Sequence, residues 1–188
     1  SQAIRQFVRK NLINASGITY LTKMVSYDKI RLKGMVMEDF VNYKVPSMFL
    51  ITSICDWKCC KEANIDISIC QNQSLTKQPT KTYSYESIYQ AYVNNPITKA
   101  IVIGGLEPFD QFAEIFRLIL YFRAQGCDDM FVIYTGYDKH ELSELYMLKM
   151  LKNITVKFGR FKPNNKPHFD SVLGVNLISD NQYAEVIS

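Results

Sequence analysis

The sequence predicts an α/β fold in which a parallel β-sheet is covered by helices on its outside. Three observations support this prediction: short apolar runs alternate with segments of helical period, the apolar runs are continuous, and no repeat or linker divides the chain. Continuous apolar strands are typical of parallel sheets, which are buried on both faces. The 188 residues fit one domain with a core of ordinary size.

The first predicted strand is the apolar run at 48–52 (MFLIT), which precedes four of the five cysteines. We therefore expect the cysteines to lie on the loop that leaves this strand. The polar segment at 60–82 is predicted to be a loop with one short helical turn.

A helix at 84–93 and a strand at 100–103 come next. Ser84 is a suitable N-cap for the helix. Pro96 ends the helical pattern because the residue before a proline disfavours the helical conformation.

The same alternation continues to the end of the chain. Apolar residues at helical spacing predict two further helices, the first with Pro108 at its start and Gly126 behind its end, the second with leucines along one stripe. Continuous apolar runs predict the remaining strands. In order, these elements are a helix at 108–123, a strand at 130–134, a helix at 138–152, a strand at 154–158 and a fifth strand at 171–178.

Three unusual segments each follow the carboxyl end of a predicted strand. They are the cysteine segment, the run 104–108 (GGLEP) and the run 134–136 (YTG). Ligands of open parallel sheets bind at the carboxyl ends of the strands. We therefore expect the three segments to meet at one edge of the sheet and to form the site.

Charge and hydropathy exclude two classes of function. The net charge of +4 comes from dispersed basic residues, so nucleic-acid binding is not indicated. No apolar run approaches the roughly 20 residues that a membrane-spanning helix needs, so no membrane contact is expected.

The first residues and the cysteine count indicate a cytoplasmic protein. Residues 1–23 make a poor secretory signal because polar residues interrupt the apolar stretch, and we expect an N-terminal extension of uncertain role, such as an appended helix. Residues 24–188 form the predicted domain. Five cysteines, with Cys59 and Cys60 adjacent, do not fit a disulfide framework, so reduced thiols are expected.

The cysteine segment predicts a metal centre. Thiolates suit an iron–sulfur cluster, zinc or copper(I). Structural zinc sites commonly have two pairs of ligands, and here the second pair is missing. Three thiolates hold three irons of a [4Fe–4S] cluster and leave the fourth iron open to another ligand. The candidate ligands are Cys55, Cys59, Cys60 and Cys70, whereas Cys127 is expected to be a small apolar residue.

The Gly-Gly-Leu-Glu-Pro run is suited to an amino acid head group. Glycine allows the backbone to approach a ligand closely, and Glu107 would accept from an ammonium group beside a helix N-terminus. The plain alternative is that Gly104 and Gly105 make a tight turn and that Glu107 only favours the helix dipole.

These residues resemble those of the radical S-adenosylmethionine superfamily. In that family three cysteines, the first two spaced as Cys55 and Cys59 are, hold a [4Fe–4S] cluster whose open iron chelates the amine and carboxylate of S-adenosylmethionine. The resemblance implies a partial (β/α) barrel and reductive cleavage of this cofactor to a 5′-deoxyadenosyl radical. A Gly-Gly-Glu-like motif contacts the amine, and its counterparts here are Gly104, Gly105, Leu106 and Glu107.

The match narrows to the anaerobic ribonucleotide reductase activating proteins. The segments 38–42 (EDFVN), 133–137 (IYTGY), 158–161 (FGRF) and 179–182 (SDNQ) are similar to motifs of that family, and the resemblance covers roughly residues 35–188. It implies that the adenosyl side of the pocket and the contacts to cofactor or partner come from Tyr134, Thr135, Gly136, Asn181 and Gln182.

The chain departs from the family pattern at the third cysteine. The usual spacing has a cysteine at the position that Glu62 occupies. The ligands are therefore three of four cysteines, with Cys55, Cys59 and Cys70 favoured and Cys60 in reserve.

The resemblance also implies partners. They are a large glycyl-radical subunit of an anaerobic (class III) ribonucleoside-triphosphate reductase, from which a glycine hydrogen is abstracted, and an electron donor such as flavodoxin or ferredoxin. Two alternatives stay open: a radical enzyme that acts on a small molecule or peptide, and a non-enzymatic module that binds a cluster or zinc.

Overall fold

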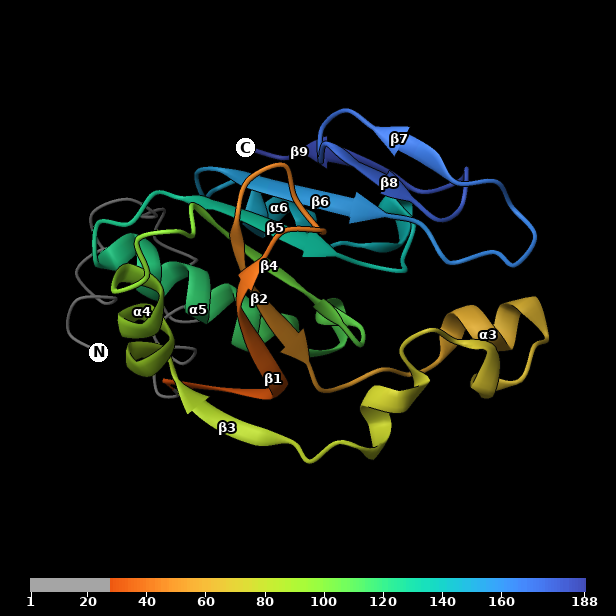
Figure 1. Cartoon of the computed structure of the whole chain (residues 1–188), viewed down its shortest axis with the longest axis horizontal. Coiled ribbons are helices and arrows are strands. Elements are labelled where there is room, and N and C mark those ends of the chain that lie inside the picture. Colours follow the sequence, from red (N-terminus) through yellow and green to blue (C-terminus); the bar gives the residue numbers. More distant parts are fainter. Residues whose placement is uncertain (1–27) are drawn as a thin grey trace.

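The computed structural model describes residues 28–188, and a mixed seven-stranded β-sheet forms its centre (Figure 1). The strand order is β3-β1-β2-β4-β5-β6-β9. The four central strands β2, β4, β5 and β6 are parallel, and the outer strands β1, β3 and β9 run antiparallel to their neighbours. The strands are β1 (Lys29–Asp39), β2 (Ser47–Thr52), β3 (Lys81–Ser84), β4 (Ala100–Gly105), β5 (Met130–Tyr134), β6 (Ile154–Phe158) and β9 (Tyr183–Val186).

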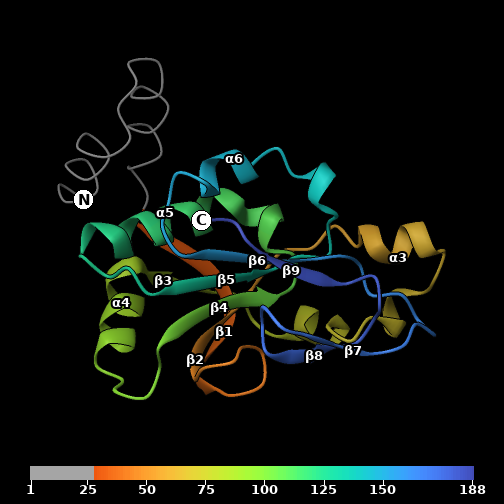
Figure 2. The ribbon, with the colours of Figure 1, turned by 90° about the horizontal axis from the view of Figure 1, so that it is seen from above.

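Helices cover one face of the sheet. These are α4 (Tyr85–Val93), α5 (Phe112–Ala124) and α6 (Leu145–Leu148), and Figure 2 shows α5 and α6 on the side away from β7 and β8. Their apolar side chains and those of the strands form the larger core. Its largest fully buried side chains include Tyr85, Phe116, Phe122, Phe131 and Phe158.

The opposite face is covered by two loops. One is the β1–β2 connection, and the other is the two-stranded hairpin of β7 (His168–Asp170) and β8 (Val175–Leu177). Tyr43, Leu173 and Leu177 contribute to a second, smaller core between these loops and the sheet. The sheet is thus buried on both faces, as its continuous apolar strands require.

The central strands and the first predicted helix are confirmed. The runs 48–52, 100–103, 130–134 and 154–158 lie in β2, β4, β5 and β6. In α4, the Ser84 side chain accepts a hydrogen bond from the backbone N–H of Ser87 at 3.1 Å, as expected of an N-cap.

The predicted helix at 108–123 is instead two helices. A 3₁₀ turn, η3 (Pro108–Gln111), precedes α5, because Gln111 leaves the helical conformation at φ −127° and ψ 31°. Its side chain donates to the carbonyl of Arg31 at 3.0 Å and accepts from the N–H of Ser53 at 2.8 Å. These two bonds connect the start of the helix to β1 and to the end of β2.

The predicted helix at 138–152 is wrong in extent. Only η4 (Lys139–Glu141) and the single turn α6 are helical, because Asp138 and Glu141 form a capping box and Leu142 is extended. The leucines are nonetheless buried, so their spacing correctly indicated core residues although they do not lie on one continuous helix.

Several elements were not predicted. The segment 60–82, predicted to be a loop with one short helical turn, contains the two turns η1 (Ile67–Ile69) and η2 (Gln73–Lys77), while α3 (Lys58–Ala63) extends across its start and the edge strand β3 across its end. The predicted strand at 171–178 is a turn followed by β8, and β9 completes the main sheet in its place. The edge strand β3 buries none of its residues, and its neighbour β1 alternates exposed and buried residues over its first four, so neither has a continuous apolar run.

Two expectations about the overall architecture have different outcomes. The α/β class and the parallel centre of the sheet are confirmed. The partial (β/α) barrel stays a prediction, since the sheet of residues 28–188 is open between β3 and β9. The prediction for residues 1–23 lies outside the described residues. Within the described part, no helix is long and apolar enough to cross a membrane.

Candidate iron–sulfur site

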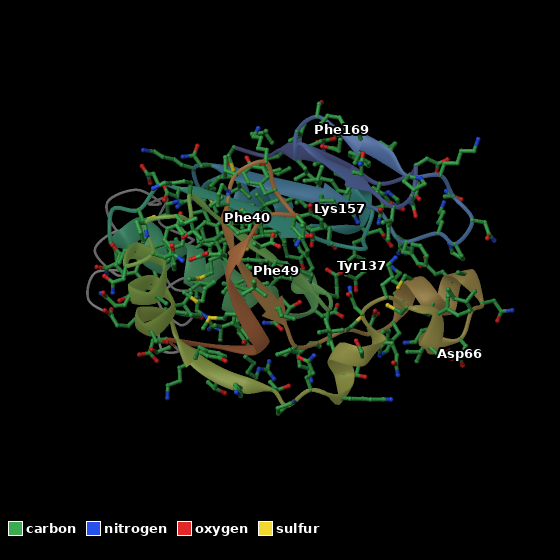
Figure 3. The ribbon with its side chains drawn as sticks, in the orientation of Figure 1. Phe40, Phe49, Asp66, Tyr137, Lys157 and Phe169 are labelled. Carbon is green, nitrogen blue, oxygen red and sulfur yellow. The ribbon has the colours of Figure 1, made fainter. Side chains whose placement is uncertain are left out.

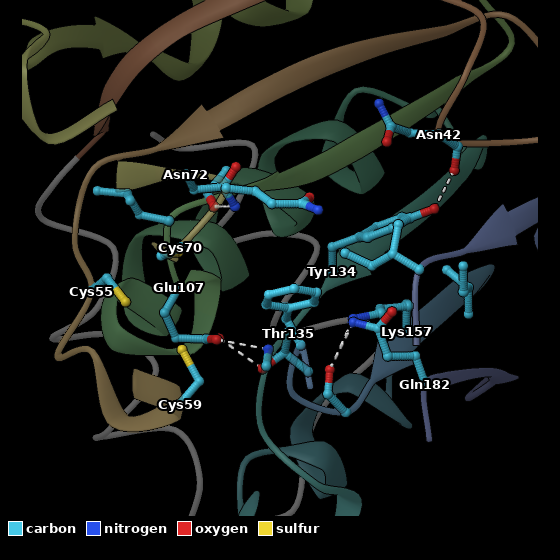
Figure 4. Close-up of a pocket in the computed structure, with 18 of the residues that line it drawn as sticks. Asn42, Cys55, Cys59, Cys70, Asn72, Glu107, Tyr134, Thr135, Lys157 and Gln182 are labelled. Carbon is cyan, nitrogen blue, oxygen red and sulfur yellow. Dashed lines mark hydrogen bonds between the residues drawn. The ribbon is translucent and has the colours of Figure 1, made fainter. Parts of the chain in front are cut away.

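A pocket of about 280 Å³ lies where the carboxyl ends of β2, β4, β5 and β6 meet. Figure 4 shows cysteines around Glu107 at one end of this pocket and Lys157, Gln182 and Tyr134 at the other. The three segments that follow the predicted strands therefore do meet at one edge of the sheet. The predicted site residues that line the pocket are Cys55, Cys59, Cys70, Gly105, Leu106, Glu107, Tyr134, Thr135 and Gly136.

The four cysteines lie in the segment between β2 and β3, partly on a loop and partly on a short helix. Cys55 lies on the loop after β2, Cys59 and Cys60 lie on α3, and Cys70 follows η1. The expectation that all of them lie on a loop is therefore wrong for Cys59 and Cys60. Cys60 is buried with 2% exposure and does not line the pocket. Burial, together with the neighbouring thiols of Cys59 and Cys70, raises its pKa.

The spacing of the thiols fits a cluster better than a single ion. Within residues 28–188, the only three candidate ligand atoms that lie within 4.8 Å of one another belong to Cys55, Asp56 and Asp110. A single zinc ion needs its ligands close together in a tetrahedron. The three pocket thiols do not all lie within 4.8 Å of one another, so they are not gathered around one ion.

Burial keeps the thiols protonated until a metal arrives. It raises the pKa of Cys55 to about 12 and that of Cys60 to about 11, and it also raises the pKa of Cys59. The charge of bound iron reverses this tendency, because a coordinating thiol loses its proton. Cys55, Cys59 and Cys60 are therefore poor nucleophiles as long as no metal is bound.

Glu107 is a buried carboxylate at the centre of the site. It caps η3 by accepting from the N–H of Phe109 at 3.0 Å. It also accepts from the Thr135 hydroxyl at 2.7 Å and from the Gly136 N–H at 2.9 Å. Burial raises its pKa to about 7, although these hydrogen bonds favour the charged form. Glu107 therefore both caps η3, as the plain alternative expected, and lines the pocket.

The two glycines of the Gly-Gly pair have different roles. A side chain on Gly104 would meet the Phe49 ring at 3.1 Å, so this glycine allows packing and does not line the pocket. Gly105 has φ +98° and would place a side chain 2.6 Å from Ile51, so only glycine fits there. Its carbonyl accepts from the side chain of Asn72 at 2.5 Å, which ties the Cys70 segment to the end of β4.

The segment 134–136 connects the sheet to Glu107 and to the β1–β2 connection. Thr135 and Gly136 donate to Glu107, as described above. Tyr134 donates its hydroxyl to the carbonyl of Asn42 at 2.5 Å. All three residues line the pocket, which is where the resemblance implied the adenosyl side.

Asn181 lies outside the pocket lining, whereas Gln182 contributes to it. The Asn181 side chain donates to the carbonyl of Arg160 at 3.0 Å, and its Oδ1 is buried without a hydrogen-bond partner among the described residues. Its backbone carbonyl lies 2.8 Å from where a side chain on Gly159 would begin. The structure therefore gives Asn181 a role in the turn that follows β6.

Lys157 lines the pocket but was not among the predicted site residues. It is 6% exposed, lies opposite Tyr134 in the sheet and donates to the carbonyl of Gly159 at 2.9 Å. Burial lowers its pKa to about 8, and Glu107 acts in the opposite direction. The sequence signal was a lysine inside the apolar strand ITVKF, which is unusual because unpaired charges are seldom buried.

A comparison with known protein families supports the prediction of a metal site. The family model described as "4Fe-4S single cluster domain" matches residues 46–177, more than half of the chain. The chain therefore belongs to the 4Fe-4S single cluster domain family, and it contains a domain that binds a [4Fe–4S] cluster. No curated protein and no solved structure gave a significant match.

The matched segment contains all the candidate metal ligands. It begins at β2 and ends with β8, so it includes the four cysteines and Glu107. The prediction of an iron–sulfur cluster is confirmed at the level of the family.

Proposed function

We propose that the protein is a radical S-adenosylmethionine activating enzyme, which generates a glycyl radical on an anaerobic (class III) ribonucleoside-triphosphate reductase. The observation that supports this most is the composition of the pocket. Three cysteines line it together with Glu107 and the glycine-rich end of β4. One pocket thus offers soft ligands for iron and polar groups for an amino acid.

In this proposal Cys55, Cys59 and Cys70 hold the cluster. All three line the pocket, whereas Cys60 is buried behind it. With three thiolate ligands, one iron stays open toward the pocket. The cluster supplies one electron to S-adenosylmethionine, whose reductive cleavage gives a methionine and a 5′-deoxyadenosyl radical.

The role of the protein is to hold S-adenosylmethionine against that open position. Glu107 supplies the carboxylate for the ammonium group, because among the described residues its Oε2 accepts a hydrogen bond only from the N–H of Gly136 and keeps acceptor capacity for a ligand. The backbone of Gly105 and Leu106 lies beside it. Tyr134 and Thr135 line the region proposed for the adenosyl group.

Apolar residues in the lining protect the radical. Trp57, Leu106 and Phe161 line the pocket beside the polar groups. Excluding water prevents side reactions of a reactive intermediate. No general base is needed, because the radical itself abstracts the hydrogen atom.

The mouth of the pocket supports a protein substrate. Val41 lines the pocket and is 71% exposed, and its neighbour Phe40 is 63% exposed (Figure 3). Exposed apolar residues beside a site favour contact with another protein. The reductase subunit is the proposed partner, and a flavodoxin or ferredoxin is the proposed electron donor.

One observation favours the alternative of a small substrate. Within residues 28–188, Lys157 is the only basic residue that lines the pocket, and it has donors left for an anionic group because an ammonium has three. A radical enzyme acting on a small anionic molecule would use such a residue. A glycine in a protein segment carries no charged side chain, so a protein substrate would not require a basic residue in the pocket.

Electron paramagnetic resonance tests the proposal. The protein is reconstituted with iron and sulfide without oxygen, reduced, and measured with and without S-adenosylmethionine. A [4Fe–4S]⁺ signal that changes on adding the cofactor supports an open iron. A signal that does not change on adding the cofactor contradicts the proposal and favours the alternative of a non-enzymatic cluster-binding module.

A second measurement separates the two enzymatic alternatives. The reduced protein with S-adenosylmethionine is mixed with a class III reductase subunit, and the glycyl radical is sought by its own resonance. Lys157→Met serves as the matched variant. If the substrate is a protein glycine, this variant still gives the radical; if the substrate is a small anion, the reductase gives no radical with either protein.

A further inference from the structure

The helix that bears Cys59 is hardly held by hydrophobic burial. Of the six residues of α3, only Cys60 is buried. Figure 1 shows α3 beyond the carboxyl ends of the central strands, away from α4 and α5. A six-residue helix in this position is too short to be stable by itself. Other contacts must therefore determine where Cys59 lies.

Arg160 supplies the strongest of these contacts. It follows β6, and its side chain is only 10% exposed. Two of its nitrogens bind the two carboxylate oxygens of Glu141, both at 2.7 Å, in a bidentate pair. Its Nε lies 2.6 Å from Oε2 of Glu62, which belongs to α3. One guanidinium group thus joins α3 to the sheet and to η4.

Lys58 closes the same network from the start of α3. Its Nζ lies 2.6 Å from Oε1 of Glu141 and 3.8 Å from Glu62. Both ends of the short helix are therefore tied to Arg160 and Glu141. We call these four residues the α3 clamp.

The clamp is adjacent to the cluster ligands. A small cavity is lined by Arg160 and Lys58 together with Cys55 and Cys59. The ring of Tyr137 lies between the two cations, 5.9 Å from the Arg160 guanidinium and 5.2 Å from Lys58 Nζ. A change in the clamp would therefore be felt directly at the thiols.

We propose that Arg160 is a positioning residue for the iron–sulfur site, and that the α3 clamp holds Cys59 in place before the cluster binds. Glu62 has a particular part in this, because it stands where the usual cysteine spacing has a third cysteine. At that position the chain has a carboxylate that anchors α3, and the third thiol comes from Cys70. The inference rests on the proposed assignment of Cys59 as a ligand.

The test measures the cysteines of the reduced, metal-free full-length protein. The rate of alkylation by iodoacetamide is followed for each cysteine by tandem mass spectrometry, which separates Cys59 from Cys60. In Arg160→Met the rate at Cys59 should rise about tenfold, because α3 loses its buried ion-pair partner. Glu62→Gln should give a smaller rise in the same direction, and Arg160→Lys should restore part of the protection.

Two controls distinguish positioning from general destabilisation. Cys127 lies behind α5, far from the clamp in the fold, and its rate should stay unchanged. Arg31→Met breaks another arginine–glutamate pair, with Glu114 at 2.5 Å, and should leave Cys59 unaffected. A rise in the alkylation rate at Cys127 in Arg160→Met would indicate general destabilisation. In that case the milder variant Glu62→Gln is the test of positioning, and it should raise the rate at Cys59 but not at Cys127.

A Cys59 rate within about twofold of the wild type in both Arg160→Met and Glu62→Gln would overturn the inference, since a clamp must respond to the loss of its partner. The reconstituted protein gives a second readout: a chelator should remove iron from Arg160→Met faster than from Arg31→Met. Neither measurement uses S-adenosylmethionine. The inference can therefore fail or hold independently of the proposed enzymatic activity.

Discussion

The helix-covered face of the sheet and the cysteine segment are stabilised by different forces. In α5, nine of the thirteen residues are buried, whereas α3 buries one of six. The core around α5 depends on apolar burial, which is strong and has no preferred direction. The cysteine segment depends on hydrogen bonds and ion pairs, which are directional. The scaffold can therefore remain folded while the site is altered, and the following predictions test this separation.

The largest expected effect is the loss of the cluster on removing one ligand. Cys55→Ala should abolish iron binding after reconstitution, because two thiolates hold a cluster poorly, while the urea unfolding of the metal-free protein changes by less than about 0.5 kcal/mol. Iron is measured per chain, with Cys127→Ala as the control that retains it. Full iron content in Cys55→Ala would remove Cys55 from the ligand set, and loss of iron in Cys60→Ala would bring Cys60 into it.

On the other side of the comparison, a core substitution should act on the fold. Phe116 of α5 is fully buried, and Phe116→Ala should lower the free energy of unfolding by about 3–5 kcal/mol. Tyr146 on α6 is 65% exposed, and Tyr146→Ala should change the free energy of unfolding by less than about 0.5 kcal/mol. Urea unfolding of the metal-free proteins measures both. Equal effects of the two substitutions would contradict the assignment of the core.

Glu107 links the two regions and should make stability depend on pH. Burial raises its pKa from the usual 4.5 to about 7, so the folded protein binds more protons than the unfolded chain between these pH values. Stability therefore falls as the pH rises from about 4.5 to about 7, by up to about 3 kcal/mol. Below this window the effect is absent, and above it the loss is complete.

Glu107→Gln removes the titrating group at nearly constant shape and should flatten this part of the pH profile. Urea unfolding of the metal-free wild type and variant at several pH values measures the difference. Parallel profiles would mean that Glu107 titrates normally in the folded state. In the reconstituted protein, the same variant should keep its iron but bind S-adenosylmethionine more weakly, which equilibrium binding would measure.

The smallest expected effect concerns the contact between the sheet and the β1–β2 connection. Tyr134→Phe removes one hydrogen bond, to the carbonyl of Asn42, and should cost about 1 kcal/mol of unfolding free energy. The iron content should not change, since Tyr134 lies at the end of the pocket away from the cysteines (Figure 4). A loss of iron in this variant would show that the two ends of the pocket are coupled.

The elements that were predicted correctly share one property. The strands β2, β4, β5 and β6 and the helix α4 each have a local pattern of apolar residues or a capping serine. The errors have two causes: a distant contact that overrides the local pattern, and a local capping box inside a predicted helix. Gln111 interrupts a helical pattern to bind Arg31 and Ser53, and the capping box of Asp138 and Glu141 shortens the next helix.

The site could be predicted in part for the same reason. Parallel strands bring their carboxyl ends to one edge, so Cys55, Glu107 and Thr135 could be expected together from the order of strands. The place of Lys157 in the pocket could not be predicted in this way, because only the assembled sheet places Lys157 opposite Tyr134. Asn181 was expected at the pocket from its motif, but the turn after β6 directs it to Arg160.

The sequence by itself therefore determined the α/β class, the central strands and the cysteine-rich edge of the sheet, because these follow from apolar periodicity and from strand direction. Only the tertiary structure decided that Cys60 is buried behind the pocket, that Gly104 serves packing, and that Glu62 binds Arg160. The physical reason is that these roles depend on side chains that are distant in the chain. Burial and ion pairing are properties of the assembled neighbourhood, and no local pattern encodes them.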